Sequence, residues 1–328
     1  MNIGWIEISL KKYGGVIYNQ EAREALADDF NVELVVAEPR YFSKIRYLRI
    51  PESLFYLRRL SGQKDIWVRD FYSTLTMPLD KTSGKNIVVI HHDDFSGFPF
   101  LVRPIFKIAQ KFFYRNLKKA DGIITVSEYW RKYFVDKGYR NVYKIYNGFN
   151  VEDFIFSDQE ILDFKSKYNL SDKPIVYLGN CQKAKGVAES YNALKDLDVY
   201  LVTSGRKKVN VKTINFDLSY RDYLRLLKAS DVVITMSKFR EGWCRTAHEA
   251  MLCEVPVIGS GRGGMQELLE GGKQIICPEF KNLSKEVEDL LGNERKRKVT
   301  GENGYAYAKD FTKDKFKEDW INLIKKIK

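Results

Sequence analysis

Residues 231–264 restrict the fold of this chain more than any other stretch. They begin with a short apolar, β-branched run (231–236) that predicts a buried strand. A polar loop over 237–243 follows, and from about Cys244 the apolar residues recur at helical spacing. A second apolar run, 255–258, predicts another buried strand and leads into a glycine-rich turn. This order predicts a parallel α/β sheet, in which ligands bind beyond the carboxyl ends of the strands.

Two glutamates mark this stretch: Glu241 in the predicted loop and Glu249 within the predicted helix. The start of a helix presents N–H groups without intrahelical partners and a positive partial charge, which suits a phosphate-bearing ligand. The two carboxylates would then accept hydrogen bonds from hydroxyl groups of that ligand. Their spacing alone is more typical of solvent-facing glutamates at helix ends, so the functional interpretation needs further support.

That support is the pattern around the pair, in which seven residues separate the glutamates and H-E-A-M-L-C-E-V-P-V-I includes the second one. It resembles the signature of retaining GT-B glycosyltransferases of the family 4 type. Where that family has Pro-Ser, Phe and Gly, this chain has Met236-Ser237, Trp243 and Glu254. These departures lie outside the two glutamates, so the resemblance is specific.

The resemblance implies the α/β class and a GT-B architecture, with two Rossmann-like domains facing across a cleft. It places an acceptor-side domain at 1–150 and a nucleotide-sugar-binding domain at 151–310. A C-terminal helix, about 311–328, crosses back to the first domain. Independently, the alternating pattern of the first half predicts strands and helices. The strands are expected near 2–8, 32–37, 65–69, 86–91, 122–126 and 142–145, and the helices near 15–28, 99–119 and 128–137.

A second loop of the resemblance follows the apolar run P-I-V-Y-L-G. The family has Gly-Arg there and then Lys-Gly, with the Arg and the Lys on the donor's diphosphate. This chain keeps Lys185 and Gly186, but Asn180 replaces the arginine. The replacement removes a charge-assisted bidentate donor, which affects donor affinity or the kind of donor. Lys183 and Arg206 are candidate substitutes.

The reaction implied by the resemblance is sugar transfer from a nucleoside-diphosphate sugar to an acceptor hydroxyl, with retention of configuration. Glu249 would hold the ribose hydroxyls, Glu241 the hydroxyls of the donor sugar, and Lys185 the diphosphate. The glycine pair at the start of the first predicted helix would close over that diphosphate. The full donor-binding set is Gly14, Gly15, Asn180, Lys185, Glu241, Gly242, Trp243, Cys244, Glu249, Gly263 and Gly264.

A polar cluster ends the predicted strand near 86–91, where the chain reads H-H-D-D. In the resembled family a histidine here lies near the sugar and the acceptor and is commonly followed by Asp. Because alternate strand residues face opposite ways, at most one of the two histidines is expected to line the crevice. The family pattern favours His92, with Asp93, on the acceptor side and leaves His91 as the second choice. The catalytic set is therefore Glu241, Lys185 and His92.

Three other functions are compatible with parts of the sequence. Residues 259–264 read G-S-G-R-G-G after a predicted strand, and Glu279 lies 20 residues past Gly259, as in NAD-type Rossmann oxidoreductases. That fingerprint normally follows the first strand of its domain, whereas this one comes late, so we interpret Gly263-Gly264 as the second glycine turn of the resembled family. The missing arginine also leaves open a catalytically degenerate protein that only binds nucleotide-sugars or other anionic ligands. A glycoside hydrolase would need paired carboxylates across the bond, which sequence alone does not exclude.

The formal net charge of +12 is unevenly distributed: residues 1–150 carry 24 basic and 16 acidic side chains. Two segments of this half, 40–64 and 98–119, are both basic and aromatic. They suit an anionic membrane surface beside a glycan or lipid-linked acceptor, and equally a core helix with a solvated basic face. No recognised nucleic-acid-binding motif appears, so no nucleic-acid partner is expected.

The rest of the composition indicates the cellular environment in which the protein is expected to work. Four cysteines without a C-x-x-C pair and only three histidines predict a reduced, cytoplasmic protein with no metal and no cofactor beyond the donor substrate. No apolar stretch reaches the 18 residues of a membrane span, and the N-terminus does not resemble a signal peptide. Any membrane association is therefore expected to be peripheral, on the inner face.

Overall fold

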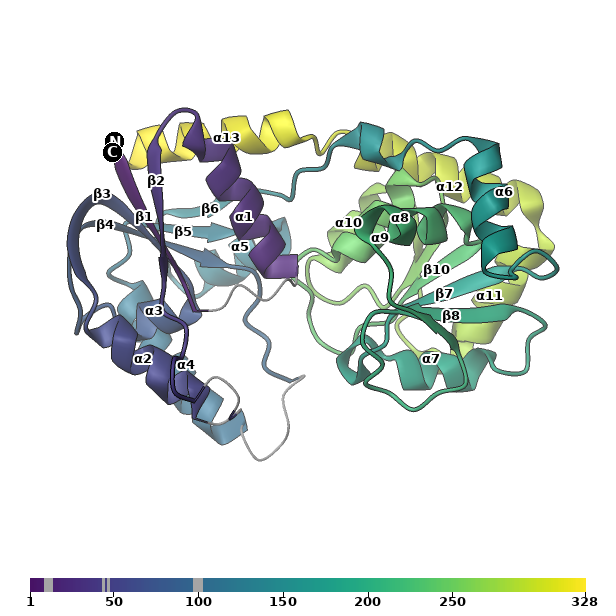
Figure 1. Cartoon of the computed structure of the whole chain (residues 1–328), viewed down its shortest axis with the longest axis horizontal. Helices are drawn as coiled ribbons and strands as arrows, with labels where there is room; N and C mark the ends of the chain where they lie inside the picture. Colours follow the sequence, from purple (N-terminus) through teal and green to yellow (C-terminus); the bar gives the residue numbers. More distant parts are fainter. Residues whose placement is uncertain (9–13, 43–44, 46–47, 97–102) are drawn as a thin grey trace. The chain divides into compact units, whose positions relative to one another are not determined.

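The computed structural model describes residues 1–8, 14–42, 45, 48–96 and 103–328 (Figure 1). The chain divides into two compact units. Unit 1 comprises residues 1–147 and 313–328, and unit 2 comprises residues 148–312. Each contains one six-stranded sheet whose strands all run parallel, so the predicted pair of Rossmann-like domains is confirmed.

The sheet of unit 1 has the strand order β2-β1-β3-β4-β5-β6. Its strands are β1 (Asn2–Glu7), β2 (Asn31–Val36), β3 (Ser61–Arg69), β4 (Lys81–Ile90), β5 (Gly122–Thr125) and β6 (Val142–Lys144). All six were predicted, but β3 and β4 begin earlier than expected. Their first halves are largely exposed and polar, so an apolar run reveals only the buried second halves.

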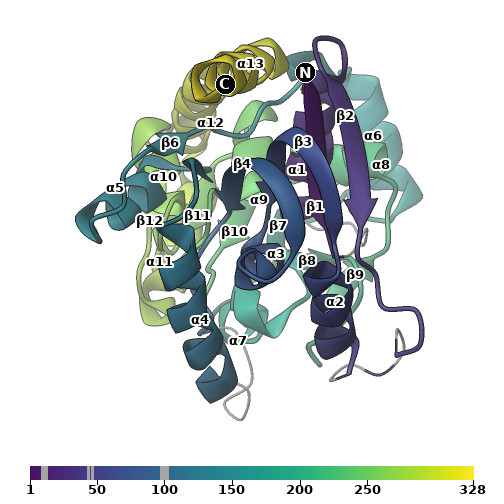
Figure 2. The same cartoon turned by 90° about the vertical axis from the view of Figure 1, so that its left-hand side faces the viewer.

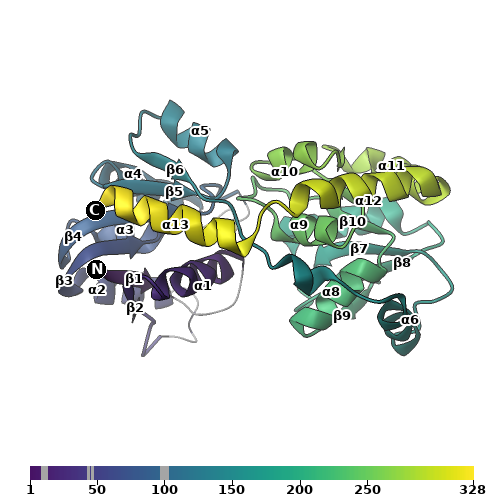
Figure 3. The same cartoon turned by 90° about the horizontal axis from the view of Figure 1, so that it is seen from above.

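Helices cover both faces of this sheet. The helices α1 (Gly14–Ala27) and α13 (Lys313–Ile327) lie alongside each other on one face, as Figure 3 shows. Trp320 of α13 packs 5.4 Å from the ring of Trp5 and 6.3 Å from that of Tyr18. The Tyr18 hydroxyl donates to the carbonyl of Ile145 at 3.0 Å. These contacts make the last helix of the chain part of the core of unit 1.

The other face carries α2 (Arg49–Arg58), α3 (Phe71–Thr76), α4 (Arg103–Leu117) and α5 (Glu128–Asp136). Figure 2 shows α2, α3 and α4 beside one another. The sequence did not predict α2 or α3, because one lies in a segment recognised only as basic and aromatic and the other spans fewer than two turns. The predicted helix over 99–119 is confirmed from Arg103, and residues 99–102 lie outside the described residues.

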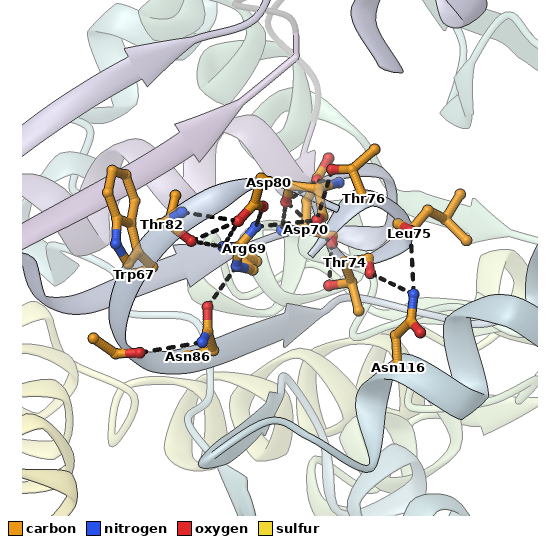
Figure 4. Close-up of polar contacts among 12 residues, drawn as sticks. Trp67, Arg69, Asp70, Thr74, Leu75, Thr76, Asp80, Thr82, Asn86 and Asn116 are labelled. Carbon is orange, nitrogen blue, oxygen red and sulfur yellow. Dashed lines mark hydrogen bonds and ion pairs between the residues drawn. The ribbon is translucent and has the colours of Figure 1, made fainter. Parts of the chain in front are cut away.

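A buried polar network joins β3 to β4 in unit 1 (Figure 4). The Arg69 guanidinium pairs with Asp80 at 2.8 Å and donates to Thr82 and Asn86 at 2.6 Å each. The side chains of the ion pair are at most 1% exposed. Asp70, directly after β3, caps α3 by accepting from a backbone N–H in its first turn. The network fixes the start of α3 against the sheet.

The sheet of unit 2 has the order β12-β11-β10-β7-β8-β9. Its strands are β7 (Ile175–Asn180), β8 (Tyr200–Ser204), β9 (Ile214–Phe216), β10 (Val232–Thr235), β11 (Val257–Gly259) and β12 (Ile275–Ile276). One face is covered by α7 (Val187–Leu194) and α11 (Leu283–Gly292). The other side carries α8 (Tyr220–Ala229), α9 (Arg245–Leu252) and α10 (Met265–Gly271), with α12 (Glu294–Ala308) packed on α9. A further helix, α6 (Asp158–Lys167), packs on α8.

Each sheet has one place where successive strands depart in opposite directions. In unit 2 it lies between β7 and β10, and in unit 1 between β1 and β3. Open parallel sheets bind their ligands at such a switch point, beyond the carboxyl ends of the strands. The topology therefore directs attention to the loops after β7 and β10 in unit 2 and after β1 and β3 in unit 1.

Candidate functional site

The switch point of unit 2 brings two predicted site residues into direct contact. Lys185 follows β7 and Glu241 follows β10, and the lysine Nζ lies 2.6 Å from the carboxylate Oε1. The Ser237 hydroxyl donates to the same carboxylate. The lysine side chain is 32% exposed and the glutamate 8%. The pair thus presents one partly exposed cation, anchored by a buried carboxylate, where an open sheet binds its ligand.

Burial disfavours the charged form of Lys185, but the negative charge of Glu241, the neighbouring Cys244 and the hydrogen bond to Glu241 together raise the pKa of the lysine above its ordinary value. The ammonium also lies 5.2 Å from the ring centroid of Phe239, within cation–π range. Lys185 therefore carries its positive charge throughout the neutral range.

Two glycines allow the surrounding loops to approach each other. Gly186 has φ +72°, and a Cβ there would lie 2.2 Å from the carbonyl oxygen of Met236. Gly263 also has φ +72°, and a Cβ there would lie 2.5 Å from the carbonyl oxygen of Glu241. The Gly264 N–H donates to that same oxygen at 2.9 Å. The glycine turn after β11 thus supports the backbone of the Glu241 loop, and a side chain at Gly186 or Gly263 would separate the loops.

The second glutamate of the pair lies on α9 and is held by two tyrosines of α8. The Glu249 carboxylate accepts from the Tyr223 hydroxyl at 2.9 Å and from the Tyr220 hydroxyl at 3.3 Å. Burial and the charge of Glu249 raise the pKa of Tyr223 well above its ordinary value, so that phenol remains a donor. Sequence reasoning missed both tyrosines, although their spacing of three in S-Y-R-D-Y places them on one helix face.

The start of α9 has an unusual backbone. Cys244 is its N-cap residue and has φ +74°, which is rare for a residue with a side chain. Burial, and then the charge of Glu241, raises the pKa of the Cys244 thiol to about 12, so the thiol is neutral. Strained backbone of this kind concentrates at functional sites. Gly242 and Cys244 remain predicted donor contacts.

Trp243 lies between them, but its side chain belongs to the core of unit 2. Its indole N–H donates to His248 Nδ1 at 3.0 Å, and its ring lies 5.2 Å from that of Phe311. His248 Nε2 is 3.0 Å from the carbonyl of Ala308, and burial lowers the pKa of this histidine to about 3. Any contact of Trp243 with a donor therefore rests on its backbone.

Asn180, which replaces the family's arginine, is the last residue of β7. Its side-chain oxygen accepts from the Gln182 amide at 3.0 Å, and a Cβ on Gly205 would come within 2.9 Å of its amide nitrogen. Lys183 is exposed in the same loop, and Arg206 is exposed just after the neighbouring strand β8. Both candidate substitute cations thus lie at the carboxyl ends of adjacent strands.

In unit 1, Gly14 and Gly15 are the first two residues of α1, the helix that follows β1. The switch point there also carries two carboxyl groups that sequence reasoning missed. Glu7 ends β1 and pairs with Arg23, and Asp70 follows β3. Burial raises the pKa of both carboxyls. In the sequence, these two positions could have been recognised from the acidic residue at the end of each apolar run.

The predicted acceptor residues follow β4, which ends at Ile90. His91 Nε2 lies 3.2 Å from the Asn19 side-chain oxygen, and burial lowers the pKa of this histidine to about 3. His92 is exposed. Asp93 is buried and accepts from the Gln110 amide at 2.6 Å and from the Tyr114 hydroxyl. Asp93 therefore holds α4 to this loop, and His92 is the more accessible of the two histidines.

Within the part of the chain that the structure describes, no three His, Cys, Asp or Glu side chains are grouped as a metal site would require. Among the described helices, none is long and apolar enough to cross a membrane.

Two sequence families match the chain in succession. The family described as Glycosyltransferase Family 4 matches residues 16–153, and the family described as Glycosyl transferases group 1 matches residues 158–307. An uncharacterized glycosyltransferase of Methanocaldococcus jannaschii is 30% identical over 219 residues, 62% of this chain and 59% of that protein. An α-1,4-N-acetyl-D-galactosaminyltransferase of Campylobacter jejuni, named for a PP-undecaprenol-linked saccharide, is 25% identical over 182 residues, 54% of this chain and 51% of that protein.

A solved structure agrees with these matches. Anabaena HepE, in complex with UDP and glucose, aligns with 99% of this chain and 100% of its own at a TM-score of 0.77 and 17% identity, which shows a shared fold. The aligned part of this chain spans no more than about three fifths of either curated relative.

Proposed function

This chain belongs to the GT-B glycosyltransferases of the family 4 type, and from that premise we propose that it transfers a sugar from a nucleoside-diphosphate sugar to an acceptor hydroxyl, with retention of configuration. The observation that carries the proposal is the Lys185–Glu241 contact at the switch point of unit 2. A cation anchored there suits the diphosphate, and Glu249 on the following helix suits the nucleoside.

In the proposed reaction the bond between the sugar's anomeric carbon and the β-phosphate oxygen breaks, and a bond to the acceptor oxygen forms. The bonding electrons leave with the nucleoside diphosphate, and the proton of the acceptor hydroxyl passes to an oxygen of that departing phosphate. Negative charge therefore grows on the leaving phosphate. Lys185, which is charged at neutral pH, would stabilise that charge together with the N–H groups at the start of α9.

The two glutamates have separate roles in this scheme. Glu241 would accept from hydroxyls of the donor sugar while its contact with Lys185 positions the ammonium. Glu249 would accept from the ribose hydroxyls, in an orientation fixed by Tyr223 and Tyr220. Gly14 and Gly15 would contribute backbone N–H groups to the diphosphate.

Unit 1 would supply the acceptor side. His92 and His91 are the groups that would contact the acceptor or the sugar, and Asp93 would act by positioning their loop through α4. The acceptor is a glycan or a lipid-linked saccharide at an anionic membrane surface. The basic, aromatic segments 40–64 and 98–119 support this, as does the lipid-linked saccharide in the name of the Campylobacter jejuni relative.

The topology argues against a NAD-dependent oxidoreductase. In such enzymes the glycine fingerprint follows the first strand of the nucleotide-binding sheet. Here the first strand of unit 2 is β7, which leads into the Lys185 loop, whereas Gly259–Gly264 follows β11 and supports the Glu241 loop.

A ligand panel tests the proposal. Thermal unfolding would be followed with UDP-, GDP-, ADP- and dTDP-sugars and with NAD, and slow hydrolysis of any stabilising donor would then be assayed. We expect one class of nucleoside-diphosphate sugar to raise the unfolding temperature, and Lys185→Ala to abolish its hydrolysis. Lys195→Ala, at an exposed position after the far end of α7, is the matched control and should retain most of the activity. Stabilisation by NAD and by none of the sugars would contradict the proposal.

A further inference from the structure

Unit 1 contains an apolar groove that the proposed sugar transfer does not use. It lies between α2, α3 and α4, the three helices that Figure 2 shows side by side, and has a volume of about 550 Å³. That volume lies within the range of about 300–1,000 Å³ typical of small-ligand sites. The apolar side chains that line it include Leu54, Phe55, Leu75, Leu79, Ala109 and Phe112.

The two long walls are helical faces with regular spacing. On α2 the lining residues stand at positions 51, 54, 55 and 58, and on α4 at positions 109, 112, 115 and 116. Both sets follow the three- and four-residue spacing of one helix face. Phe55 and Phe112 remain 49% exposed, and Leu79 is 57% exposed. Each helix therefore turns an apolar face toward the groove and leaves it uncovered, which marks an interaction surface.

The apolar stripe continues along α4 beyond the groove. Ile105 and Ile108 are 67% and 59% exposed, and with Phe112 they share one side of the helix. Lys111, Arg115 and Lys118 lie on a flank of this stripe. An exposed apolar stripe with basic residues beside it is the pattern of helices that lie in a membrane interface.

The charge of the groove is of one sign. Arg58 and Arg115 are among its lining residues, and the twelve lining residues include no acidic side chain. The Arg115 guanidinium lies 5.2 Å from the ring centroid of Phe112, and the neighbouring Arg59 lies 4.0 Å from that of Phe55. The cations thus stand directly over the exposed aromatic rings, so an occupant with an apolar body and an anionic head would match both features.

The floor of the groove is held in place from behind. The Asn116 side-chain amide donates to the carbonyls of Thr74 and Leu75 at 3.0 and 3.1 Å, which ties α4 to the end of α3 (Figure 4). The start of α3 is fixed by the Asp70 cap beside the buried Arg69–Asp80 pair. A rigid, preformed groove loses little conformational entropy when a ligand binds in it.

We propose that this groove holds one hydrocarbon chain of an anionic phospholipid, with Arg58 and Arg115 on its phosphate, and so attaches unit 1 to a membrane. A second copy of the chain is a poorer occupant, because a two-fold contact through this face would bring the arginines of both copies together. The proposal deepens the proposed function by naming a lipid partner for unit 1, but lipid binding is measurable without sugar transfer.

The test uses the full chain and dihexanoyl-phosphatidylglycerol below its micelle concentration, titrated by calorimetry. Ala109→Trp fills the groove without changing any charge and should abolish binding. Leu79→Asp, at an exposed lining position that cannot disrupt the core, should do the same.

Arg58→Ala with Arg115→Ala should weaken binding about thirty-fold, roughly five-fold for each arginine. Lys132→Ala with Arg140→Ala removes the same charge from exposed positions of unit 1 outside the groove and should leave affinity within about two-fold.

Comparison ligands identify the source of any binding. Dihexanoyl-phosphatidylcholine should bind more weakly than the anionic lipid, and glycerol 3-phosphate should bind least. Equal binding of glycerol 3-phosphate would reduce the site to an anion site and overturn the proposal. Unchanged lipid binding in both Ala109→Trp and Leu79→Asp would also overturn it, as would a dimer, seen by light scattering, that these variants dissociate. Donor binding should be the same in every groove variant, so failure here leaves the proposed transfer standing.

Discussion

The two units have the same layers but different ionisable groups at their switch points. In unit 2 the strand order reverses between β7 and β10, and the group nearest solvent there is the ammonium of Lys185. In unit 1 the order reverses between β1 and β3, and the groups at those strand ends are the carboxyls of Glu7, which pairs with Arg23, and of Asp70. The difference teaches that the topology locates a site in each unit, whereas the local charge decides which ligand each one suits.

An anionic diphosphate is attracted to a cation and repelled by carboxylates, which supports the proposed placement of the donor in unit 2. Carboxyl groups accept hydrogen bonds from hydroxyls, which suits a sugar acceptor in unit 1. Two other arginines of unit 1, Arg58 and Arg115, line the groove between α2 and α4. Each switch point thus contains an acid–base pair, and the more accessible charge of the pair in unit 2 is the Lys185 ammonium.

The largest effect should come from Lys185→Ala. We expect kcat to fall about 100- to 1,000-fold, the usual result of removing one preorganised group that stabilises transition-state charge. The affinity for the donor should fall less, because charge on the leaving phosphate is greatest in the transition state. Steady-state kinetics would measure both. An unchanged kcat with only a raised KM would make Lys185 a binding contact alone.

The control for this prediction comes from the other switch point. Glu7→Gln removes a carboxylate of unit 1 and should raise the KM for the acceptor while leaving the KM for the donor unchanged. A loss of donor affinity in Glu7→Gln would break the assignment of donor to unit 2 and acceptor to unit 1.

Glu249→Ala should have the next largest effect, a loss of donor affinity of about 10- to 150-fold. The estimate follows from roughly 1.5–3 kcal/mol for hydrogen bonds to a charged acceptor. Tyr223→Phe, which keeps the carboxylate and removes one phenol donor to it, should give a smaller loss in the same direction. Calorimetric titration of the nucleoside diphosphate measures both, with circular dichroism to show that the variants are folded. Full affinity in folded Glu249→Ala would exclude the ribose role.

Much of this fold could be predicted because its strands are buried. The run at 231–236 was found since buried parallel strands are apolar along their whole length. The polar first half of β4 was missed for the converse reason. The short helix α3 exists because Asp70 and Ser73 cap each other's backbone N–H groups, and that D-x-x-S signal was in the sequence.

The site was predicted residue by residue, but its internal contacts were not. Lys185 and Glu241 were both expected to contact the donor, yet their ion pair depends on β7 and β10 being neighbours. These two residues, 56 apart in sequence, become neighbours only through the order of the strands in the sheet, which apolar runs do not reveal. The same holds for Tyr223 and Glu249, and for Trp243, whose core partners come from the distant end of unit 2.

A smaller effect compares the buried histidines of the two units. Burial lowers the pKa of His248 in unit 2 and of His91 in unit 1 to about 3. As pH falls through about 6.5, each of these histidines becomes protonated in the unfolded chain, whereas in the folded protein it stays neutral until about pH 3. Stability is therefore lost as pH falls through this window, by up to about 1.4 kcal/mol per pH unit for each histidine.

This loss can be assigned by measuring unfolding free energy between pH 6.0 and 5.0 in His248→Gln and His91→Gln. In each variant the unfolding free energy should depend less steeply on pH than in the parent protein, by the contribution of the replaced histidine. This comparison of slopes does not depend on the absolute stability of the variant. The effect should be cleaner in His248, because Trp243 donates to its Nδ1 and a proton on that nitrogen would break the hydrogen bond. A slope identical to that of the parent protein would show that the histidine titrates normally in the folded state.

The smallest expected effect is that of removing metal ions. A metal-dependent transferase needs carboxylates grouped around its diphosphate, and the described residues contain no such group of three. The charge at the switch point of unit 2 is instead a protein cation, Lys185, that stays protonated at neutral pH. Dialysis against EDTA should therefore leave turnover unchanged, whereas Lys185→Ala should not be rescued by added Mg²⁺ or Mn²⁺. Loss of activity in EDTA that either metal restores would show that the diphosphate is neutralised by an ion, and the contrast between Lys185 at the switch point of unit 2 and the carboxyl groups at that of unit 1 would no longer explain where the donor binds.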